Sequence, residues 1–383
     1  MTLSSQDMKE FLQRGFTRRS FGQIATMIAG ASALPFYNEP ALAQLSRVRG
    51  EIPADAVLIN ANENPLGPCE EAREAARKIV ANGGRYMYGE TDKVAKLLAQ
   101  QEGVKEEYVR IYAGSSAPLH QTVMAFTSPT KPFVVADPGY EAGGRAATFI
   151  GAKVVKVPLA KDYSHDVRAM LKAGGSDAGL FYICNPNNPT GTLTKRADIE
   201  WLVENKPKGS VVMIDEAYTH IAGDDYFSTN LVQKDKDVII LRTFSKIYGM
   251  AGMRAGAAIG RPDLIAKMAG LGAGMMPITG MAAASTSLKV KNLIPERRAI
   301  IGGVRDETIS FLQSKNYTVV PSVSNKFMID LRRDPHPVIA KLATDYHVYI
   351  GRVWPVWPTY VRVSVGTKEE MERFKSAFLK VMA

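Results

Sequence analysis

The sequence of 383 residues contains only two cysteines and has no apolar run long enough to cross a membrane. A stable transmembrane helix needs about 20 consecutive apolar residues, so none is predicted. Cys69 and Cys184 are far apart and form no metal-binding or redox motif. Cys184 ends an apolar run, which favours a buried structural thiol; a disulfide to Cys69 is the alternative if the chain is exported.

The sequence also lacks clustered charge, internal repeats and low-complexity tracts. The formal net charge is +10, but the basic residues are scattered and form no tail, so nucleic-acid binding is not expected. Hydrophobic residues make up 46% and charged residues 22% of the chain, which is typical of a soluble globular protein with a substantial core.

Residues 1–43 are expected to lie outside the fold. The pair Arg18-Arg19 precedes the uncharged, Gly/Ala-rich stretch Ile24 to Phe36, and Ala41-Leu42-Ala43 provides the small residues that a signal peptidase recognises. This pattern resembles a twin-arginine export signal, with cleavage before Gln44 and a periplasmic or otherwise exported mature protein. The alternatives are an amphipathic N-terminal helix and, if the signal is not used, a cytoplasmic protein.

The rest of the chain alternates short apolar runs with helical patterns. Seven β-branched, apolar runs predict buried strands: 109–112, 133–136, 154–157, 180–183, 211–214, 238–241 and 255–259. Such runs separated by helices indicate an α/β fold with a mainly parallel sheet covered on both faces. Since ligands bind at the carboxyl ends of such strands, the residues that follow each run are informative.

The run 238–241 is followed by a stretch from Arg242 to Arg254 that suits a phosphorylated aldehyde. Lys246 offers an amine for an imine, and Thr243, Ser245 and Arg254 offer donors for a phosphate. Pyridoxal phosphate requires this combination. By itself, however, a Ser-Lys pair in a loop is more often solvated surface.

Other strand ends add compatible groups. Ser115 and Ser116 precede a helical stretch whose N-terminus would attract an anion. Tyr140 follows the second run, and Asn188 lies in the rigid turn Asn185–Gly191 after the fourth. Asp215 ends the fifth run, where a buried carboxylate needs a cationic partner such as a pyridinium nitrogen, and Tyr218 follows one turn later.

Taken together, these motifs resemble the fold-type I pyridoxal-phosphate enzymes of the aminotransferase class I/II family, and most of all the histidinol-phosphate aminotransferase branch. The segments that carry the resemblance stand in the family's order and spacing: Asn62-Glu63-Asn64-Pro65, 185–191, 215–218, Ser245-Lys246 and Arg254. The resemblance covers residues 57–383. It implies an aspartate aminotransferase-like fold with an arm at 44–69, a large cofactor-binding domain at 70–280 and a smaller α+β domain at 281–383.

The resemblance also implies residue roles. Lys246 would form the Schiff base with the cofactor and then move the substrate's proton, and Asp215 would pair with the ring nitrogen. Tyr218 and Asn188 would contact the phenolic oxygen, and Tyr140 would stack on the ring. The phosphate would be held by Ser115, Ser116, Thr243, Ser245 and Arg254, with Tyr86 reaching it from the partner subunit of a homodimer. Arg362, assisted by Arg352 and with Asn62 nearby, would bind the substrate. No metal site is expected.

Several positions depart from the family pattern and bear on the substrate. Ser116 and Ala117 stand where the family usually has acidic residues, and Met87 replaces a proline in Arg-Tyr-Pro. Trp354 and Trp357 flank the expected anion-binding strand and suggest a bulky or aromatic side-chain pocket.

Three functions fit these motifs. The first is a transaminase that moves an amino group from an amino acid or related amine to a 2-oxo acid. The second is a pyridoxal-phosphate oxidase, lyase or decarboxylase, which the motifs do not distinguish from the first. The third is a cofactor-binding regulator, which is disfavoured because no DNA-binding module precedes the arm.

Overall fold

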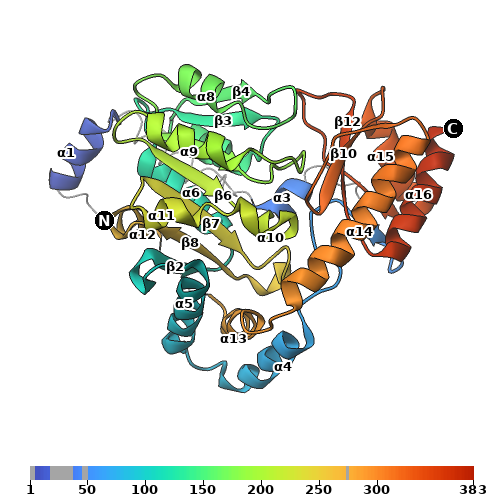
Figure 1. The fold of residues 1–383 in the computed structure, drawn as a ribbon, viewed down its shortest axis with the longest axis horizontal. Helices are drawn as coiled ribbons and strands as arrows, with labels where there is room; N and C mark the ends of the chain where they lie inside the picture. Colours follow the sequence, from blue (N-terminus) through green and yellow to red (C-terminus); the bar gives the residue numbers. More distant parts are fainter. Residues whose placement is uncertain (1–4, 18–37, 45–50, 273–275) are drawn as a thin grey trace.

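The computed structural model describes residues 5–17, 38–44, 51–272 and 276–383. Its centre is a seven-stranded sheet with the order β2-β8-β7-β6-β5-β3-β4 (Figure 1). The strands are β2 (Val109–Tyr112), β3 (Phe133–Asp137), β4 (Val154–Pro158), β5 (Leu180–Cys184), β6 (Val211–Asp215), β7 (Val238–Thr243) and β8 (Gly256–Gly260). All seven strands predicted from the sequence are confirmed within one or two residues.

One strand runs against the others. Strands β3 to β7 pair in parallel, whereas β8 is antiparallel to both β2 and β7. Residues 244–255 connect β7 to β8 with only the short 3-10 turn η4 (Ala251–Met253) and no covering helix. A parallel return normally needs a helical crossover, so this connection doubles back beside its own strand.

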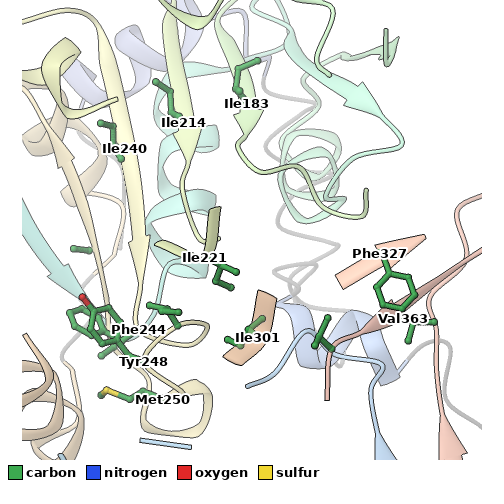
Figure 2. Packing of buried hydrophobic residues seen from close by; sticks show 14 of the residues in the cluster. Ile183, Ile214, Ile221, Ile240, Phe244, Tyr248, Met250, Ile301, Phe327 and Val363 are labelled. Atoms are coloured by element: carbon green, nitrogen blue, oxygen red, sulfur yellow. The ribbon is translucent and has the colours of Figure 1, made fainter. Parts of the chain in front are cut away.

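Helices cover both faces of the sheet, which explains why β5, β6 and β7 are buried along their whole length. Alternate residues enter two hydrophobic clusters. Ile214 and Ile240 lie in one of them (Figure 2). Met213 and Leu241 lie in the other. The helices are α5 (Tyr88–Glu102), α6 (Ser116–Phe126), α7 (Ala142–Phe149), α8 (Val167–Gly174), α9 (Arg196–Asn205), α10 (Thr219–Ala222), α11 (Thr229–Gln233) and α12 (Pro262–Ala269).

At the lower side of Figure 1, helix α13 (Ile278–Ser287) packs against both α5 and α4 (Glu70–Ile79). The expected domain boundary between residues 280 and 281 falls inside α13. Because α13 packs against α4 and α5, it groups with the helices of the large sheet. The remaining 3-10 turns are η1 (Val80–Asn82), η2 (Glu106–Tyr108) and η3 (Asp224–Tyr226).

The C-terminal part contains a separate antiparallel sheet, in the order β12-β10-β9, which the long helix α14 (Leu293–Ser314) precedes. Its strands are β9 (Thr318–Val319), β10 (Lys326–Asp330) and β12 (Tyr360–Ser364), with α15 (Pro335–Tyr346) and α16 (Lys368–Met382) beside them. The expected strand at 348–353 is shorter: β11 (Val348–Tyr349) pairs in parallel with β1 (Val57–Leu58) instead of joining this sheet. The arm is thereby tied to the C-terminal part.

Two parts of the N-terminal segment lie against the fold, which differs from the expectation that residues 1–43 stand apart from it. The first part is α1 (Ser5–Gln13) with the turn that follows it. In this turn Arg14 donates to Met124 O at 2.6 Å and to Thr127 O at 3.1 Å, at the C-terminal end of α6. Helix α3 (Glu39–Gln44) buries Leu42, which is 2% exposed. The Arg18-Arg19 pair and the apolar stretch 24–36 lie outside the described residues.

Within the described ranges, no helix is both long and apolar enough to span a bilayer. Both cysteines are free thiols in the structure, and Cys184 is buried. The interpretation of Cys184 as a buried structural thiol is therefore confirmed.

Candidate active site

A cavity opens at the carboxyl ends of the central strands. Its lining includes all ten residues that the sequence assigned to a cofactor from this chain: Ser115, Ser116, Tyr140, Asn188, Asp215, Tyr218, Thr243, Ser245, Lys246 and Arg254. They come from the loops after β2, β3, β5, β6 and β7. The parallel sheet gathers these loops at one edge, although up to 139 residues separate them in sequence.

Lys246 is the amine of the cavity and is only 7% exposed. Its Nζ donates to Asn62 O at 2.8 Å, and Asn64 Nδ2 donates to the Lys246 carbonyl at 2.9 Å. The arm therefore positions the lysine at both its backbone and its side chain. Burial lowers the pKa of Lys246 to about 8, so a useful fraction of the amine is neutral near neutral pH. A neutral amine is the nucleophilic form.

The opposite wall bears a carboxylate. Asp215 is 4% exposed and accepts hydrogen bonds from Tyr182 Oη at 2.8 Å and from Ala217 N at 3.1 Å. Burial raises the pKa of Asp215, although these two bonds and the charges of nearby lysines act against the rise. A cation placed beside Asp215 would favour its charged form further.

Backbone and side-chain donors converge between β2 and β8. Helix α6, which is eleven residues long, starts at Ser116 and directs its N-terminus into the cavity. Arg254 adopts a left-handed backbone conformation, with φ of 55°, and Nη1 donates to Ala251 O at 2.8 Å. A Cβ at Gly114 would lie 2.3 Å from Arg254 Nη2, so only glycine lets the guanidinium reach this place. Thr243 Oγ1 and Ser245 Oγ, 3.0 Å apart, complete the anion site.

Tyr218 faces Lys246 across the cavity. Its hydroxyl accepts from Asn62 Nδ2 at 3.2 Å, and burial raises the pKa of Tyr218 well above its ordinary value. The sequence interpretation missed Lys326, whose Nζ lies 3.0 Å from the centroid of the Tyr218 ring. Lys326 is fully buried on β10 and donates to Ser324 Oγ at 2.9 Å. A lysine directly before the apolar run 327–329 was the available signal.

Arg362 and Arg352, which the sequence assigned to the substrate, do not line the cavity themselves, but each contacts a residue that does. Arg362 is fully buried and donates to Asn188 Oδ1 at 2.9 Å and to Asn60 O at 2.7 Å. Arg352 is 3% exposed and forms an ion pair with Glu141. Both guanidinium groups pack against the Trp354 ring, with centroid distances of 4.8 and 5.4 Å. The two arginines therefore form a buried cationic pair beside the cavity, and their role in substrate binding stays a prediction.

Two tryptophans are placed differently from the sequence expectation. Trp354 is 2% exposed and is held by its donation to Gly139 O at 2.9 Å. Trp357 packs against Tyr163 and Tyr360, so neither tryptophan lines the cavity. Tyr86 is 68% exposed and does not line the cavity of its own chain, so its assignment to the site of a partner subunit stays a prediction.

A buried ion network under the site was also missed. Arg242, at the end of β7, donates to both oxygens of Glu102 on α5, at 2.8 and 2.9 Å, and to Glu216, the residue after Asp215. The network thereby links the strand ends that carry Lys246 and Asp215. Its partners, 26 and 140 residues from Arg242 in sequence, carry no shared motif.

The donor set fits pyridoxal phosphate. The buried amine of Lys246 suits the aldehyde, Asp215 suits a protonated ring nitrogen, and the anion site around Arg254 suits the phosphate. Within the described residues no group of histidine, cysteine and carboxylate side chains is arranged to hold a metal.

Comparison with known proteins agrees with this geometry. Residues 54–378 match the family described as aminotransferase class I and II. The chain belongs to this family. It is a pyridoxal-phosphate-dependent aminotransferase, whose substrates are an amino donor and a 2-oxo acid.

Individual relatives extend the comparison. The chain is 33% identical to the histidinol-phosphate aminotransferase of Symbiobacterium thermophilum over 84% of this chain and 90% of that protein. It is 29% identical to an aromatic amino acid aminotransferase of Cutibacterium acnes, over 83% of this chain and 90% of that protein. Among solved structures, the chain is similar to histidinol-phosphate aminotransferase from Sinorhizobium meliloti in complex with pyridoxal-5'-phosphate. The TM-score is 0.81 at 26% identity, and the match covers 91% of this chain and 95% of that chain. A Thermus thermophilus aspartate aminotransferase, 21% identical, shares the fold with a TM-score of 0.76.

In this aminotransferase the bound cofactor supplies an electron sink beside the substrate's Cα. The chain's own groups perform the remaining tasks. Lys246 Nζ would take and return the Cα proton, and Asp215 would keep the ring nitrogen protonated. The anion site around Arg254 would hold the phosphate end, and Arg362 would orient the substrate's negative group.

Proposed function

We propose that the amino donor is an α-amino acid whose carboxylate binds Arg362 and Asn188, and that the 2-oxo acid uses the same site. The observation that carries the proposal is the geometry around Arg362, a fully buried guanidinium whose Nη1 donates to Asn188 Oδ1 at 2.9 Å. Asn188 lines the cavity that also contains Lys246, so a carboxylate bound here lies next to the reacting amine. Arg362 Nε and Arg352 Nη1 have no hydrogen-bond partner among the described residues. Both guanidinium groups therefore retain capacity for an anion.

The side chain of the donor is bulky or aromatic in this proposal. Tyr140 and Tyr218 give the cavity aromatic walls, and one relative, from C. acnes, carries the name aromatic amino acid aminotransferase. Histidinol phosphate is the competing donor, because many relatives carry that name and two arginines also suit a phosphate.

The active unit is a homodimer, and Tyr86 reaches the cofactor phosphate of the partner subunit. The exposure of Tyr86 and its neighbour Tyr88, 68% and 64%, supports this assembly, since adjoining exposed aromatic side chains mark interaction surfaces. The protein is exported through the twin-arginine pathway and is cleaved before Gln44, as the sequence pattern of residues 1–43 suggests.

Absorbance spectra of the purified holoenzyme test the function. Phenylalanine, tyrosine, glutamate and histidinol phosphate are added singly, followed by a 2-oxo acid, while oxygen consumption is recorded. Aromatic donors are expected to convert the cofactor fully and reversibly to its amino form. Arg362→Lys should lower the affinity for these donors at least about tenfold, since a bidentate contact is lost. Preference for histidinol phosphate would replace the aromatic proposal, and oxygen uptake would indicate an oxidase. Sedimentation and N-terminal sequencing of exported protein test the dimer and the cleavage.

A further inference from the structure

A carboxylate of the chain itself already lies in the proposed substrate-carboxylate site. Glu39 Oε1 accepts from Arg362 Nη2 at 2.7 Å and is 3.7 Å from Arg352 Nη1. Glu39 Oε2 accepts from Asn188 Nδ2 at 3.2 Å. Both oxygens are thus bound by the groups that would bind a substrate, and Glu39 lines the cavity together with Lys246.

The carboxylate is held there by a folded segment. Asn38 Oδ1 accepts from Ala41 N at 3.0 Å and so caps the first turn of α3. Leu42, one turn after Glu39, is 2% exposed and belongs to the same buried cluster as Tyr140 and Cys184. In Figure 1 α3 lies between α10 and β10, where the bonds to Asn188 and Arg362 also place it.

The buried carboxylate is ionised. Burial alone would raise the pKa of Glu39, but the charges of Arg362 and Arg352 outweigh burial and lower it to about 2. At neutral pH Glu39 therefore occupies the site as an anion, as a substrate carboxylate would. A free substrate must displace it before the cationic pair can bind a second carboxylate, because the two would repel each other at this distance.

We infer that Glu39 is an internal competitor for the substrate-carboxylate site, so that the full chain is self-inhibited until α3 leaves. The release mechanism rests on the function proposed above. A signal peptidase would hydrolyse the amide between Ala43 and Gln44, in the last turn of α3, using water to give the Ala43 carboxylate and the Gln44 amine. Glu39 and Leu42 lie on the side that is removed, so the mature enzyme loses the whole competitor.

The tether explains why cleavage would matter. A segment linked through a short chain has an effective concentration on the order of millimolar, whereas a cleaved peptide is diluted away. Competition of this kind raises the apparent KM for the donor and leaves kcat unchanged. We expect the apparent KM of the full chain to exceed that of residues 44–383 by at least about tenfold, which corresponds to about 1.4 kcal/mol of competing binding.

Four holoenzymes test the inference: the full chain, residues 44–383, Glu39→Gln and the control Glu10→Gln. Glu39→Gln keeps the shape of α3 but removes its charge, whereas Glu10 is an exposed glutamate of the same N-terminal segment. A readout that needs no turnover is the modification of Arg362 by phenylglyoxal, mapped by peptide mass spectrometry. Exposed Arg73, with a side chain 47% exposed, serves as the internal reference.

Arg362 should react at least tenfold faster in residues 44–383 and in Glu39→Gln than in the full chain and in Glu10→Gln, with Arg73 unchanged. The apparent KM for the donor should fall in the same two proteins. Equal Arg362 labelling in all four proteins, or equal KM values, would overturn the inference. Faster labelling without turnover in any form would instead contradict the proposed donor and leave the inference standing.

Discussion

Replacing Arg242 with methionine should destabilise the protein strongly and in a pH-dependent way. Methionine keeps an unbranched side chain beside Phe227, whose ring lies 4.6 Å from the guanidinium carbon, but it removes the charge between Glu102 and Glu216. The side chains of Glu102 and Glu216 are only 10% and 0% exposed, so water solvates neither charge well. Breaking a buried ion pair by removing one partner typically costs about 3–5 kcal/mol.

The magnitude can be worked from protonation. A glutamate with an ordinary pKa of about 4.3 costs about 3.7 kcal/mol to neutralise at pH 7, but only about 1 kcal/mol at pH 5. In the native protein burial raises the pKa of both glutamates, Glu102 and Glu216, and the charge of Arg242 lowers it. Its charge prevails at Glu102, where the pKa is lowered, while burial prevails at Glu216, where the pKa is raised. Without Arg242 both pKa values rise, so protonation relieves the variant as the pH falls.

Urea unfolding at fixed protein and cofactor concentrations measures the effect. Arg242→Met should lose about 3–4 kcal/mol of unfolding free energy at pH 7 and roughly 1–2 kcal/mol at pH 5. The matched control is Arg196→Met, which breaks an exposed pair with Glu200 at 3.1 Å and should cost at most about 0.5 kcal/mol. A loss under about 1 kcal/mol at pH 7, or one that is the same at both pH values, would refute the argument.

Two further predictions concern the cofactor. The rate at which the cofactor-free enzyme captures pyridoxal phosphate should rise about tenfold per pH unit up to about pH 8 and then level off, because only neutral Lys246 reacts and burial lowers its pKa to about 8. A plateau only near the ordinary lysine value, about 10.4, would contradict this, and Lys246→Ala should give no borohydride-stable adduct by mass spectrometry. Asp215→Asn should still capture the cofactor but lose at least about a hundredfold in turnover, roughly 3 kcal/mol, since asparagine cannot hold the ring nitrogen's proton. An unchanged rate would remove that role from Asp215.

Much of the fold was predictable because its signals are local. Runs such as 180–183 and 238–241 are buried on both sides, so almost every residue is apolar and β-branched or aromatic. Their carboxyl ends had to meet at one edge, which brought Ser115, Asp215 and Lys246 to one cavity as expected. The apolar pattern alone does not encode the direction of β8. This strand is antiparallel to β7 because the twelve residues that connect the two strands form no α-helix.

Other features depend on residues that are remote in sequence. Arg242 contacts Glu102 across 140 positions, Lys326 lies over the Tyr218 ring, and Arg352 and Arg362 both pack against the ring of Trp354. No local motif distinguishes these residues from ordinary surface charges, because their partners are set by tertiary packing. For the same reason Trp354 was expected to line the cavity but supports the arginines from behind.

The sequence by itself determined the chemical groups of the candidate site: the seven strands along the chain, the strand-end residues that suit pyridoxal phosphate, and the lysine expected to bind it. These follow from periodicity and from turn residues, which act over a few positions. Only the tertiary structure decided which charged side chains pair with one another in the interior. Glu39 shows this most clearly, because a residue in an expected export signal reaches Arg362, 323 positions away, through the packing of α3 between the two sheets.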